Sequence, residues 1–202
     1  MGLDDELAAH IAALTGTVAG AAGPIADVVA RLCACFEDGG KLLVCGNGGS
    51  AADAQHIAAE FMNRLRLDRR PLPAIALTTD TSVLTCVAND ACFDEVFARQ
   101  IEALGRTGDV LFALSTSGGS ANVLAALTVG RQRGMFTVGF TGESGAERMA
   151  PYCDVLLVVP SGDCARIQEC HEFVCHVIAG IVEKLLFGNA QSADLDRECG
   201  PR

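Results

Sequence analysis

Five short runs of apolar residues, alternating with segments of helical spacing, constrain the fold of this chain more than any other feature. The runs cover residues 41–45, 74–77, 109–114, 136–140 and 154–159. Strands that are apolar on both faces need cover on both faces, and their alternation with helices is typical of a parallel sheet. We therefore expect an α/β fold with a five-stranded parallel sheet flanked by helices, a three-layer sandwich of the Rossmann or flavodoxin type.

The segments between the apolar runs have the spacing of helices. We expect helices near residues 50–66, 81–88, 93–105, 121–133 and 165–187. Residues 3–37 also have this spacing, but Gly20 and Pro24 break it, so two helices or one interrupted helix are expected there. The length suits a single α/β domain. We divide the chain into an N-terminal helical segment for oligomerisation (1–37), the α/β domain (38–188) and a flexible tail (189–202).

The formal net charge is −10, which disfavours nucleic acid as a partner because a polyanion would be repelled. Basic residues do gather in one place, but a solvated helix end explains them as well: Arg64, Arg66, Arg69 and Arg70. The N-terminus is acidic where a signal peptide would be basic, and no apolar stretch is expected to approach a membrane span of 18 residues. We therefore expect a cytoplasmic protein without membrane contact.

The ten cysteines are scattered, and no C-x-x-C pair offers a zinc or redox motif. Several lie inside apolar runs, so we interpret most of them as small core residues of a reduced protein. Cys170 and Cys175 lie near two histidines of the last helix. An incidental contact between one of these thiols and a metal is therefore left open.

Two strand-to-helix turns carry residues suited to binding phosphate. The first spans Gly46 to Ser50 and the second Ser115 to Ser120. In an open parallel sheet such turns lie at the carboxyl ends of the strands, so both should face one crevice. The second turn places hydroxyls at Ser115, Thr116, Ser117 and Ser120 around a helix N-terminus, where hydroxyls, backbone N–H groups and the helix dipole can hold a phosphate monoester.

Other interpretations of these turns are available from the residues alone. A Walker A loop is excluded because no lysine follows the first turn. A dinucleotide fingerprint fits in part, through Gly46, Gly48 and Ala51, but the second strand does not end on an acidic residue. For the second turn, Ser120 could merely cap the helix while the other hydroxyls fill turn positions.

His56 and Glu60 are four residues apart on the expected helix 50–66 and share a face. Gln168, His171 and His176 follow on the last helix. Spacing alone does not decide their role, because a histidine on an apolar face is commonly a core residue and such a His/Glu pair is commonly a surface contact.

Four stretches together resemble one known family. They are residues 45–56, 87–90, 115–120 and 166–169. They are similar to the SIS (sugar isomerase) domain family and, within it, to the phosphoheptose isomerases, in order and with family spacing from about residue 5 to 187. The resemblance implies an enzyme that converts D-sedoheptulose 7-phosphate to D-glycero-D-manno-heptose 7-phosphate through an enediol, the first step of heptose biosynthesis.

The resemblance also implies roles for individual residues. Glu60 would be the catalytic base and His176 the acid, and a divalent metal, usually Zn²⁺, would be bound by His56, Glu60, Gln168 and His176. His171 matches no ligand position and is interpreted as structural or as a support for the ligands. The implied substrate contacts are Asn47, Gly48, Gly49, Ser50, Glu60, Asn89, Asp90, Ser115, Thr116, Ser117, Ser120 and Gln168. Position 119 is glycine where relatives commonly have asparagine. Family members are usually homotetramers, and the apolar N-terminal and last helices agree with that expectation.

A non-catalytic protein is the main alternative. A relative with the same fold, which associates with the replication initiator DnaA, resembles residues 72–80, 88–90 and 94–96 of this chain but lacks the acidic residue at position 60 and the histidine at 176. This chain has both. A regulatory SIS module that senses a phosphosugar is a second alternative, but such modules usually sit beside a DNA-binding domain. The pathway that the heptose would supply, a surface glycan or a secondary metabolite, is left open.

Overall fold

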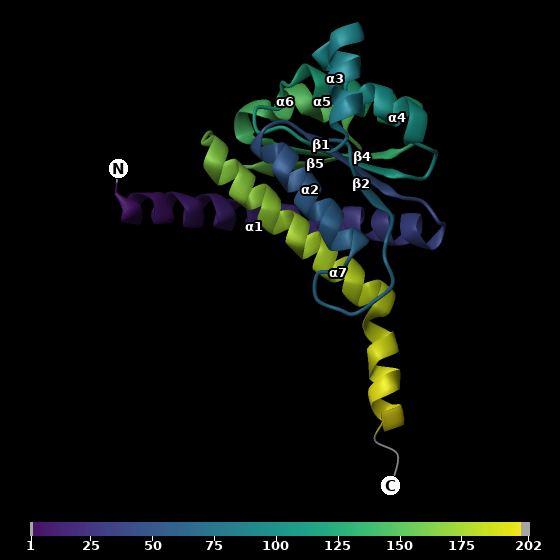
Figure 1. Ribbon diagram of the computed structural model, residues 1–202. Helices are drawn as coiled ribbons and strands as arrows, with labels where there is room; N and C mark the ends of the chain where they lie inside the picture. Colours follow the sequence, from purple (N-terminus) through teal and green to yellow (C-terminus); the bar gives the residue numbers. More distant parts are fainter. Residues whose placement is uncertain (1, 199–202) are drawn as a thin grey trace.

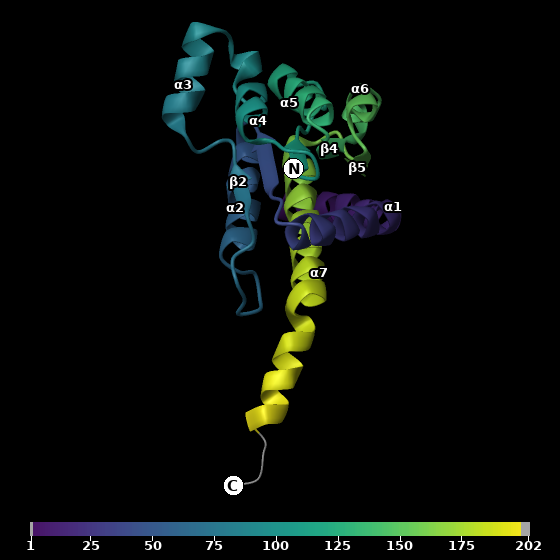
Figure 2. The ribbon, with the colours of Figure 1, turned by 90° about the vertical axis from the view of Figure 1, so that its right-hand side faces the viewer.

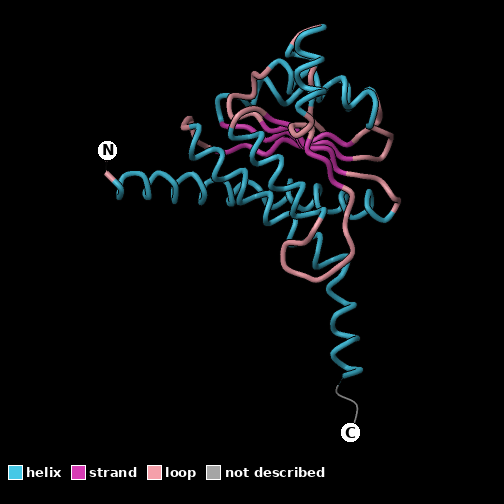
Figure 3. Tube along the Cα trace, viewed as in Figure 1, coloured by secondary structure: helices cyan, strands magenta, loops and turns pink. Residues whose placement is uncertain are grey.

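A parallel sheet of five strands forms the centre of the molecule (Figure 3). The computed structural model describes residues 2–198, and of residues 189–198 only the backbone. The strand order is β2-β1-β3-β4-β5, and each neighbouring pair is parallel. This is the flavodoxin-type order, and it confirms the expected fold class. The strands are β1 (Leu42–Gly46), β2 (Ala74–Ala76), β3 (Val110–Leu114), β4 (Phe136–Gly142) and β5 (Val155–Val159).

Helices cover both faces of the sheet, with α1, α2 and α7 on one side and α4, α5 and α6 on the other (Figure 1). The expected helices are present with shifted ends, and the expected helix 93–105 is divided into a 3₁₀ turn and α4. The 3₁₀ turns are Phe93–Glu95, Glu143–Gly145 and Ala150–Tyr152. The α-helices are α1 (Leu3–Glu37), α2 (Gly49–Met62), α3 (Thr81–Asp90), α4 (Ala98–Leu104), α5 (Ala121–Gln132), α6 (Ala146–Met149) and α7 (Cys164–Glu198).

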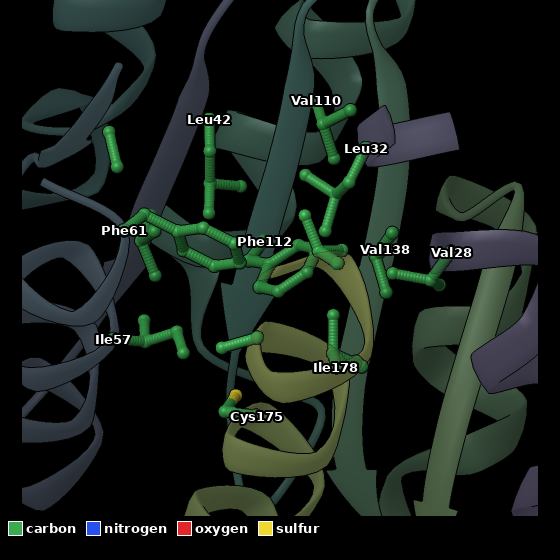
Figure 4. Packing of buried hydrophobic residues seen from close by; sticks show 14 of the residues in the cluster. Val28, Leu32, Leu42, Ile57, Phe61, Val110, Phe112, Val138, Cys175 and Ile178 are labelled. Carbon is green, nitrogen blue, oxygen red and sulfur yellow. The ribbon is translucent and has the colours of Figure 1, made fainter. Parts of the chain in front are cut away.

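The apolar strands supply two separate cores, one on each face. Leu42, Val44 and Phe112 pack with α1, α2 and α7, as Figure 4 shows for part of this core. Leu43 and Leu111, which point to the other face, pack with α4 and α5. This alternation follows from the period of two along a strand. It explains why the strand residues are apolar without a polar break.

Helix α1 is continuous, which settles the two expectations for residues 3–37 in favour of one helix that contains Pro24. A proline inside a helix costs about 3 kcal/mol because it removes a backbone hydrogen bond and clashes with the preceding turn. Burial offsets that cost on both sides of Pro24, since Ala21, Val28 and Leu32 are all buried.

The expectation that no apolar stretch would reach the length of a membrane span was wrong for α1. Among the described helices, α1 alone is long and apolar enough, with a mean hydropathy of 1.5 over 18 residues. However, α1 contributes eight buried residues to the domain, and Val28, Val29 and Leu32 lie in the same core as α7 and the strands. Such packing is how a core helix of a globular domain satisfies its apolar surface.

Helix α7 extends well past its expected end at residue 187, and its backbone is helical to Glu198 (Figure 2). The expected flexible tail begins within this helix, and residues 199–202 lie outside the described part of the chain. The flexibility of residues 189–202 stays a prediction.

The sequence analysis interpreted the four arginines after α2 as a solvated helix end, and this is wrong for Arg69, whereas Arg64, Arg66 and Arg70 are exposed. The side chain of Arg69 is 1% exposed and pairs with Glu183 of α7 at 3.0 Å. Arg70 lies over the ring of Phe187. These contacts fix the loop after α2 against α7.

The strand order also places the binding edge. The chain leaves β1 for α2 on one face of the sheet and leaves β3 for α5 on the other. Because β1 and β3 are neighbours, the sheet reverses its direction of winding between them. In open α/β sheets, ligands bind in the crevice outside the carboxyl ends of strands at such a switch point. The two turns suited to binding phosphate, which follow β1 and β3, lie at this switch point.

Candidate active site at the carboxyl edge of the sheet

The turn after β1 is tightly built from glycines. Gly48 has a φ of +56°, which favours glycine, and α2 begins at the next residue. A Cβ on Gly46 would lie 2.7 Å from the carbonyl oxygen of Ser50, so only glycine fits at the end of the strand. The N-terminus of α2 therefore opens directly onto the sheet edge, where its free N–H groups favour an anionic or polar ligand.

Two asparagines join the two turns. The side-chain amides of Asn47 and Asn122 exchange hydrogen bonds of 2.8 and 2.9 Å. Asn122 is buried at the start of α5. The expectation that both turns face one crevice is therefore supported by a direct contact. Asn47 was expected to contact substrate, and its amide is engaged in this pair.

The hydroxyls of the turn after β3 do not cap helix α5. Ser120 occupies the N-cap position, but its side chain makes no cap hydrogen bond. Its hydroxyl instead lies 3.1 Å from that of Ser115. The Ser117 hydroxyl accepts a hydrogen bond from the Gly119 N–H at 3.3 Å, and the Thr116 hydroxyl lies 3.4 Å from the Cys164 thiol. The Ser120 hydroxyl therefore does not cap α5, whereas the Ser117 hydroxyl fills a turn position, as the alternative expected. Phosphate binding by this turn stays a prediction.

Arg148 contacts this turn and was not found from the sequence. Its guanidinium donates from Nη2 to the carbonyl oxygens of Ser117 at 2.6 Å and Ser144 at 3.1 Å. A Cβ on Gly119 would lie 3.6 Å from the Arg148 Nε. Because 3.6 Å is an ordinary van der Waals contact, the arginine lies directly beside position 119 without requiring glycine there. No sequence spacing links positions 117 and 148, because α5 and β4 separate them.

Helices α2 and α7 bring two histidines and two carboxylates together. The Nε2 atoms of His56 and His176 are 2.9 Å apart. Glu60 Oε1 lies 3.3 Å from the His56 Nε2, as expected for residues four apart on a helix. Glu172 Oε1 lies 3.1 Å from the His56 Nε2 and 3.6 Å from the His176 Nε2. We call these four residues the His/Glu cluster.

The His/Glu cluster has the chemistry of a metal site. His56, Glu60 and His176 each offer a ligand atom within 4.8 Å of the others. Two imidazole nitrogens that face each other at 2.9 Å need a proton or a cation between them, because their lone pairs repel otherwise. The second carboxylate oxygen of Glu60 is buried without a hydrogen-bond partner. Imidazole nitrogens and carboxylate oxygens are the donors that a divalent metal such as zinc takes, so the residues fit the implied group.

Glu172 and Asp53 are part of this environment and were missed in the sequence. Asp53 lies one turn before His56 on α2. Burial, together with the nearby Glu172 carboxylate, raises the pKa of Asp53 to about 6. A signal for Glu172 was present, because it is four residues after Gln168 and four before His176 and thus shares their face.

Gln168 lies against the first turn. Its amide atoms would be 2.4 and 2.5 Å from a Cβ on Gly49, so the glycine makes room for this side chain. The structure therefore places Gln168 at the edge of the sheet where substrate is expected. Its role as a metal ligand stays a prediction.

His171 lies apart from the cluster, in agreement with its interpretation as structural. It is 1% exposed, and its ring packs edge-on against Phe140 at 5.8 Å between centroids. Burial lowers the pKa of His171 to about 4. The neighbouring thiols are also in the core, since Cys170 and Cys175 are buried. Among the described residues, the possible metal-binding group contains no cysteine.

Asn89 and Asp90 lie on α3, a helix without buried residues that stands out from the body of the fold (Figure 2). The Asn89 amide donates to the Asp90 carboxylate at 2.8 Å, and the Cys86 thiol lies 3.4 Å from the same carboxylate. Their partners are thus on α3 itself. The structure of one chain does not bring this pair into contact with the His/Glu cluster.

Comparisons with known proteins agree with the motifs. A family model described as the SIS domain matches residues 7–142. The phosphoheptose isomerase of Roseiflexus sp. (strain RS-1) is 55% identical over 183 residues, which cover 91% of this chain and 92% of that protein.

Two solved structures show the same fold. The phosphoheptose isomerase from Neisseria gonorrhoeae matches with a TM-score of 0.82 at 42% identity, covering 91% of this chain and all of that one. The phosphoheptose isomerase from Francisella tularensis matches with a TM-score of 0.86 at 37% identity, covering 90% of this chain and 96% of that one. The similarity therefore extends over nearly the whole length of this chain and of both solved structures.

Proposed function

This chain belongs to the SIS domain family and, within it, to the phosphoheptose isomerases, and we propose how its residues divide the work of that reaction. The chain is an enzyme, an isomerase that interconverts an aldose and a ketose. Its substrate is D-sedoheptulose 7-phosphate and its product D-glycero-D-manno-heptose 7-phosphate. One observation carries the assignment of the site: α7 places His176 against His56, and His56 and Glu60 lie on the helix that follows the first turn.

The turn from Ser115 to Ser120 would hold the phosphate. Its four hydroxyls surround the N-terminus of α5, and the hydroxyl of Ser120 is not used as a helix cap. Free N–H groups and the helix dipole favour a dianion there. Arg148 donates to the Ser117 carbonyl and so brings a positive charge beside the turn. The sugar would then extend along Asn47, Gly48, Gly49, Ser50 and Gln168 toward the His/Glu cluster.

Glu60 would act as the base. A ketose becomes an aldose when a proton leaves C1, an enediol forms, and a proton returns at C2. The carboxylate of Glu60 lies in the His/Glu cluster, and its side chain is 17% exposed, so a bound sugar can reach it. A carboxylate held beside an imidazole is suited to accept the C1 proton because its position is already fixed.

His176 would act as the acid that exchanges protons with the sugar oxygens. Its side chain is 36% exposed, so a bound sugar can reach the ring. Its Nε2 is held beside the His56 Nε2, and Glu172 lies within 3.6 Å. This placement holds a proton between positioned groups, as general acid catalysis requires.

His56, Glu60, Gln168 and His176 would hold a divalent metal, with zinc as the proposed ion. When bound, the ion would supply a positive charge that polarises an oxygen of the sugar. The protein's own contribution is to fix the two imidazoles and the Glu60 carboxylate on two packed helices, so that their positions change little during the reaction. Dialysis against a chelator and metal analysis of the wild type and of His56→Ala would test this point.

A homotetramer in the cytoplasm completes the proposal. Helices α1 and α7 expose large apolar side chains that a single chain leaves uncovered, namely Leu7, Ile11, Val18, Phe173, Ile181 and Leu185. Association would cover this surface. In such an assembly, the exposed pair Asn89 and Asp90 would contact the substrate bound by a neighbouring chain. Light scattering coupled to gel filtration measures the mass of the assembly.

The function is tested by following sedoheptulose 7-phosphate with NMR in the presence of the purified protein. We expect the signals of the aldose product to appear. A wild-type protein that is inert with and without added Zn²⁺, and that binds a DnaA-type partner, would contradict the isomerase and support the scaffold.

A further inference from the structure

We propose that Glu172 is a further protein ligand of the divalent metal, in addition to His56, Glu60, Gln168 and His176. This inference rests on the proposed metal site and extends it by a residue that lies outside the family motifs noted above. The observation that carries it is the position of the Glu172 carboxylate, which lies within 3.6 Å of the Nε2 atoms of both histidines.

The distances between donor atoms agree with a shared ion. Two ligands bonded to tetrahedral zinc at 2.0–2.1 Å lie about 3.3 Å apart. The Nε2 atoms are separated by 2.9 Å, and Glu172 Oε1 lies 3.1 and 3.6 Å from them. Glu60 Oε1 lies 3.3 Å from the His56 Nε2. The Glu172 carboxylate is thus as close to the His56 Nε2 as the Glu60 carboxylate is, and it also lies near the His176 Nε2.

The charge of Glu172 faces the two histidines. Among the residues whose side chains the structure describes, its ion pairs are with His56 and His176 only. Asp53, which also lies beside Glu172, is another acid. Histidines that bind a metal are neutral, so they would leave Glu172 without a counter-charge. A divalent cation between the imidazoles supplies that charge.

Gln168, one turn earlier on α7, is the neutral member of the proposed ligand set, and its amide lies against Gly49 of the first turn. Glu172 lies on the same face of α7 and contacts both histidines. An anionic oxygen binds a divalent cation more strongly than a neutral amide does, so Glu172 would add a stronger donor than Gln168 supplies.

The test is a Zn²⁺ titration of the wild type, Glu172→Gln and Glu169→Gln, each stripped of metal and checked for its fold by circular dichroism. Glu169 lies on the same helix and pairs with His10 and Arg166 instead, so its variant loses the same charge away from the cluster. We expect Glu172→Gln to bind Zn²⁺ at least about 100-fold more weakly, the upper end of what the loss of an outer partner costs. Glu169→Gln should bind like the wild type.

Cobalt gives a second measurement that does not depend on affinity. Co²⁺ bound to the wild type and to Glu172→Gln at saturation should differ in visible absorption, because a carboxylate donor has been replaced. Glu172→Asp keeps the charge but withdraws the carboxylate by one methylene, so its affinity should fall between the wild type and Glu172→Gln.

Two results would overturn the inference. One is equal Zn²⁺ affinity and an equal Co²⁺ spectrum for the wild type and Glu172→Gln. The other is a wild-type protein that binds no divalent metal at all. In that second case, conversion of sedoheptulose 7-phosphate by the metal-free enzyme would leave the isomerase function standing, so the two failures are distinguishable.

Discussion

The interface between α2 and α7 has charged groups at two places, and these differ in how well their polar atoms are paired. Beyond the end of α2, Glu183 accepts hydrogen bonds from the backbone N–H groups of residues 65, 66 and 67 and pairs with Arg69, and both side chains are at most 2% exposed. We call this pair the anchor. In the His/Glu cluster, His56 is 48% exposed and one oxygen of Glu60 is buried without a partner.

The difference separates stability from chemistry. A buried ion pair is tolerated when every donor and acceptor is used, and Arg69 also donates to the backbone carbonyls of Glu60, Phe61, Asn63 and Arg70. A site that must bind a ligand keeps unpaired donors and acceptors instead. Because Arg69 holds the carbonyl of Glu60 itself, the anchor also fixes the end of the helix that carries the proposed base.

The largest effect is expected from Glu60→Gln. Removing a general base lowers a rate by about 10²–10⁴, and the loss should appear in kcat. The free energy of unfolding should stay near that of the wild type, because the carboxylate makes few internal contacts. Steady-state kinetics and urea unfolding measure the two quantities. A variant that lost its stability together with its activity would contradict the separation drawn above.

Glu183→Gln should have the opposite outcome. Breaking a buried pair leaves Arg69 without its counter-charge and costs about 3 kcal/mol of stability. The protein that remains folded should keep its kcat. Glu102→Gln, at the exposed pair with Arg99, is the matched control and should change stability little. An equal effect of the two variants on unfolding would remove the distinction between a buried anchor and a surface pair.

The anchor also predicts a pH dependence. The backbone N–H groups of residues 65–67 and the Arg69 guanidinium hold the pKa of Glu183 below its usual value of 4.5, although burial opposes them. A lowered pKa of a carboxyl means that its stabilisation is present above the unfolded value and is lost as the pH falls through the folded value. The difference in unfolding free energy between the wild type and Glu183→Gln should be constant above about pH 4.5 and shrink below it. A difference that grew on acidification would contradict this sign.

Ser120→Ala tests the phosphate end of the site. Since the Ser120 hydroxyl does not cap α5, its loss should cost little stability. A hydrogen bond to a charged group contributes about 1.5–3 kcal/mol, so KM should rise roughly 10- to 100-fold with kcat less affected. Thr128→Val removes a hydroxyl from the same helix, bonded to the Leu124 carbonyl, and should leave KM unchanged. A loss of stability without a rise in KM would restore the capping interpretation.

The smallest effect is expected from Arg148→Met. The arginine positions the turn through the Ser117 carbonyl, so its removal should raise KM by about three- to tenfold, the loss of one ordinary hydrogen bond. Arg131→Met is a matched control, because Arg131 lies in the last turn of α5, at the opposite end from Ser120, and donates to the Pro151 carbonyl. Equal KM values for the two variants would show that Arg148 has no part in the site.

The sequence predicted the fold and the binding edge because these depend on local patterns. Continuous apolar runs determine a parallel sheet, and glycine and serine turns at strand ends determine where it can bind a phosphate. The continuity of α1 through Pro24 was not predictable, since it depends on the burial of Val28 and Leu32 against other elements.

The parts of the site that were missed depend on contacts between distant segments. Arg69 was interpreted as solvated because its partner, Glu183, lies more than one hundred residues away. Arg148 and Ser117 are likewise joined only by the fold. Glu172 is different, because its spacing from Gln168 and His176 was visible but acquired a meaning only when α7 was found against α2.

The most direct test of the central claim, that the incompletely paired His/Glu cluster performs the proton transfer, is isomerisation in D₂O followed by NMR. The wild type should place solvent deuterium at C2 of the heptose 7-phosphate product, because the proton taken from C1 exchanges on Glu60 before it returns. Glu60→Gln should show neither product nor exchange at C1, whereas Glu183→Gln should show both while it remains folded. Product without any deuterium at C2, or normal exchange by Glu60→Gln, would contradict the account.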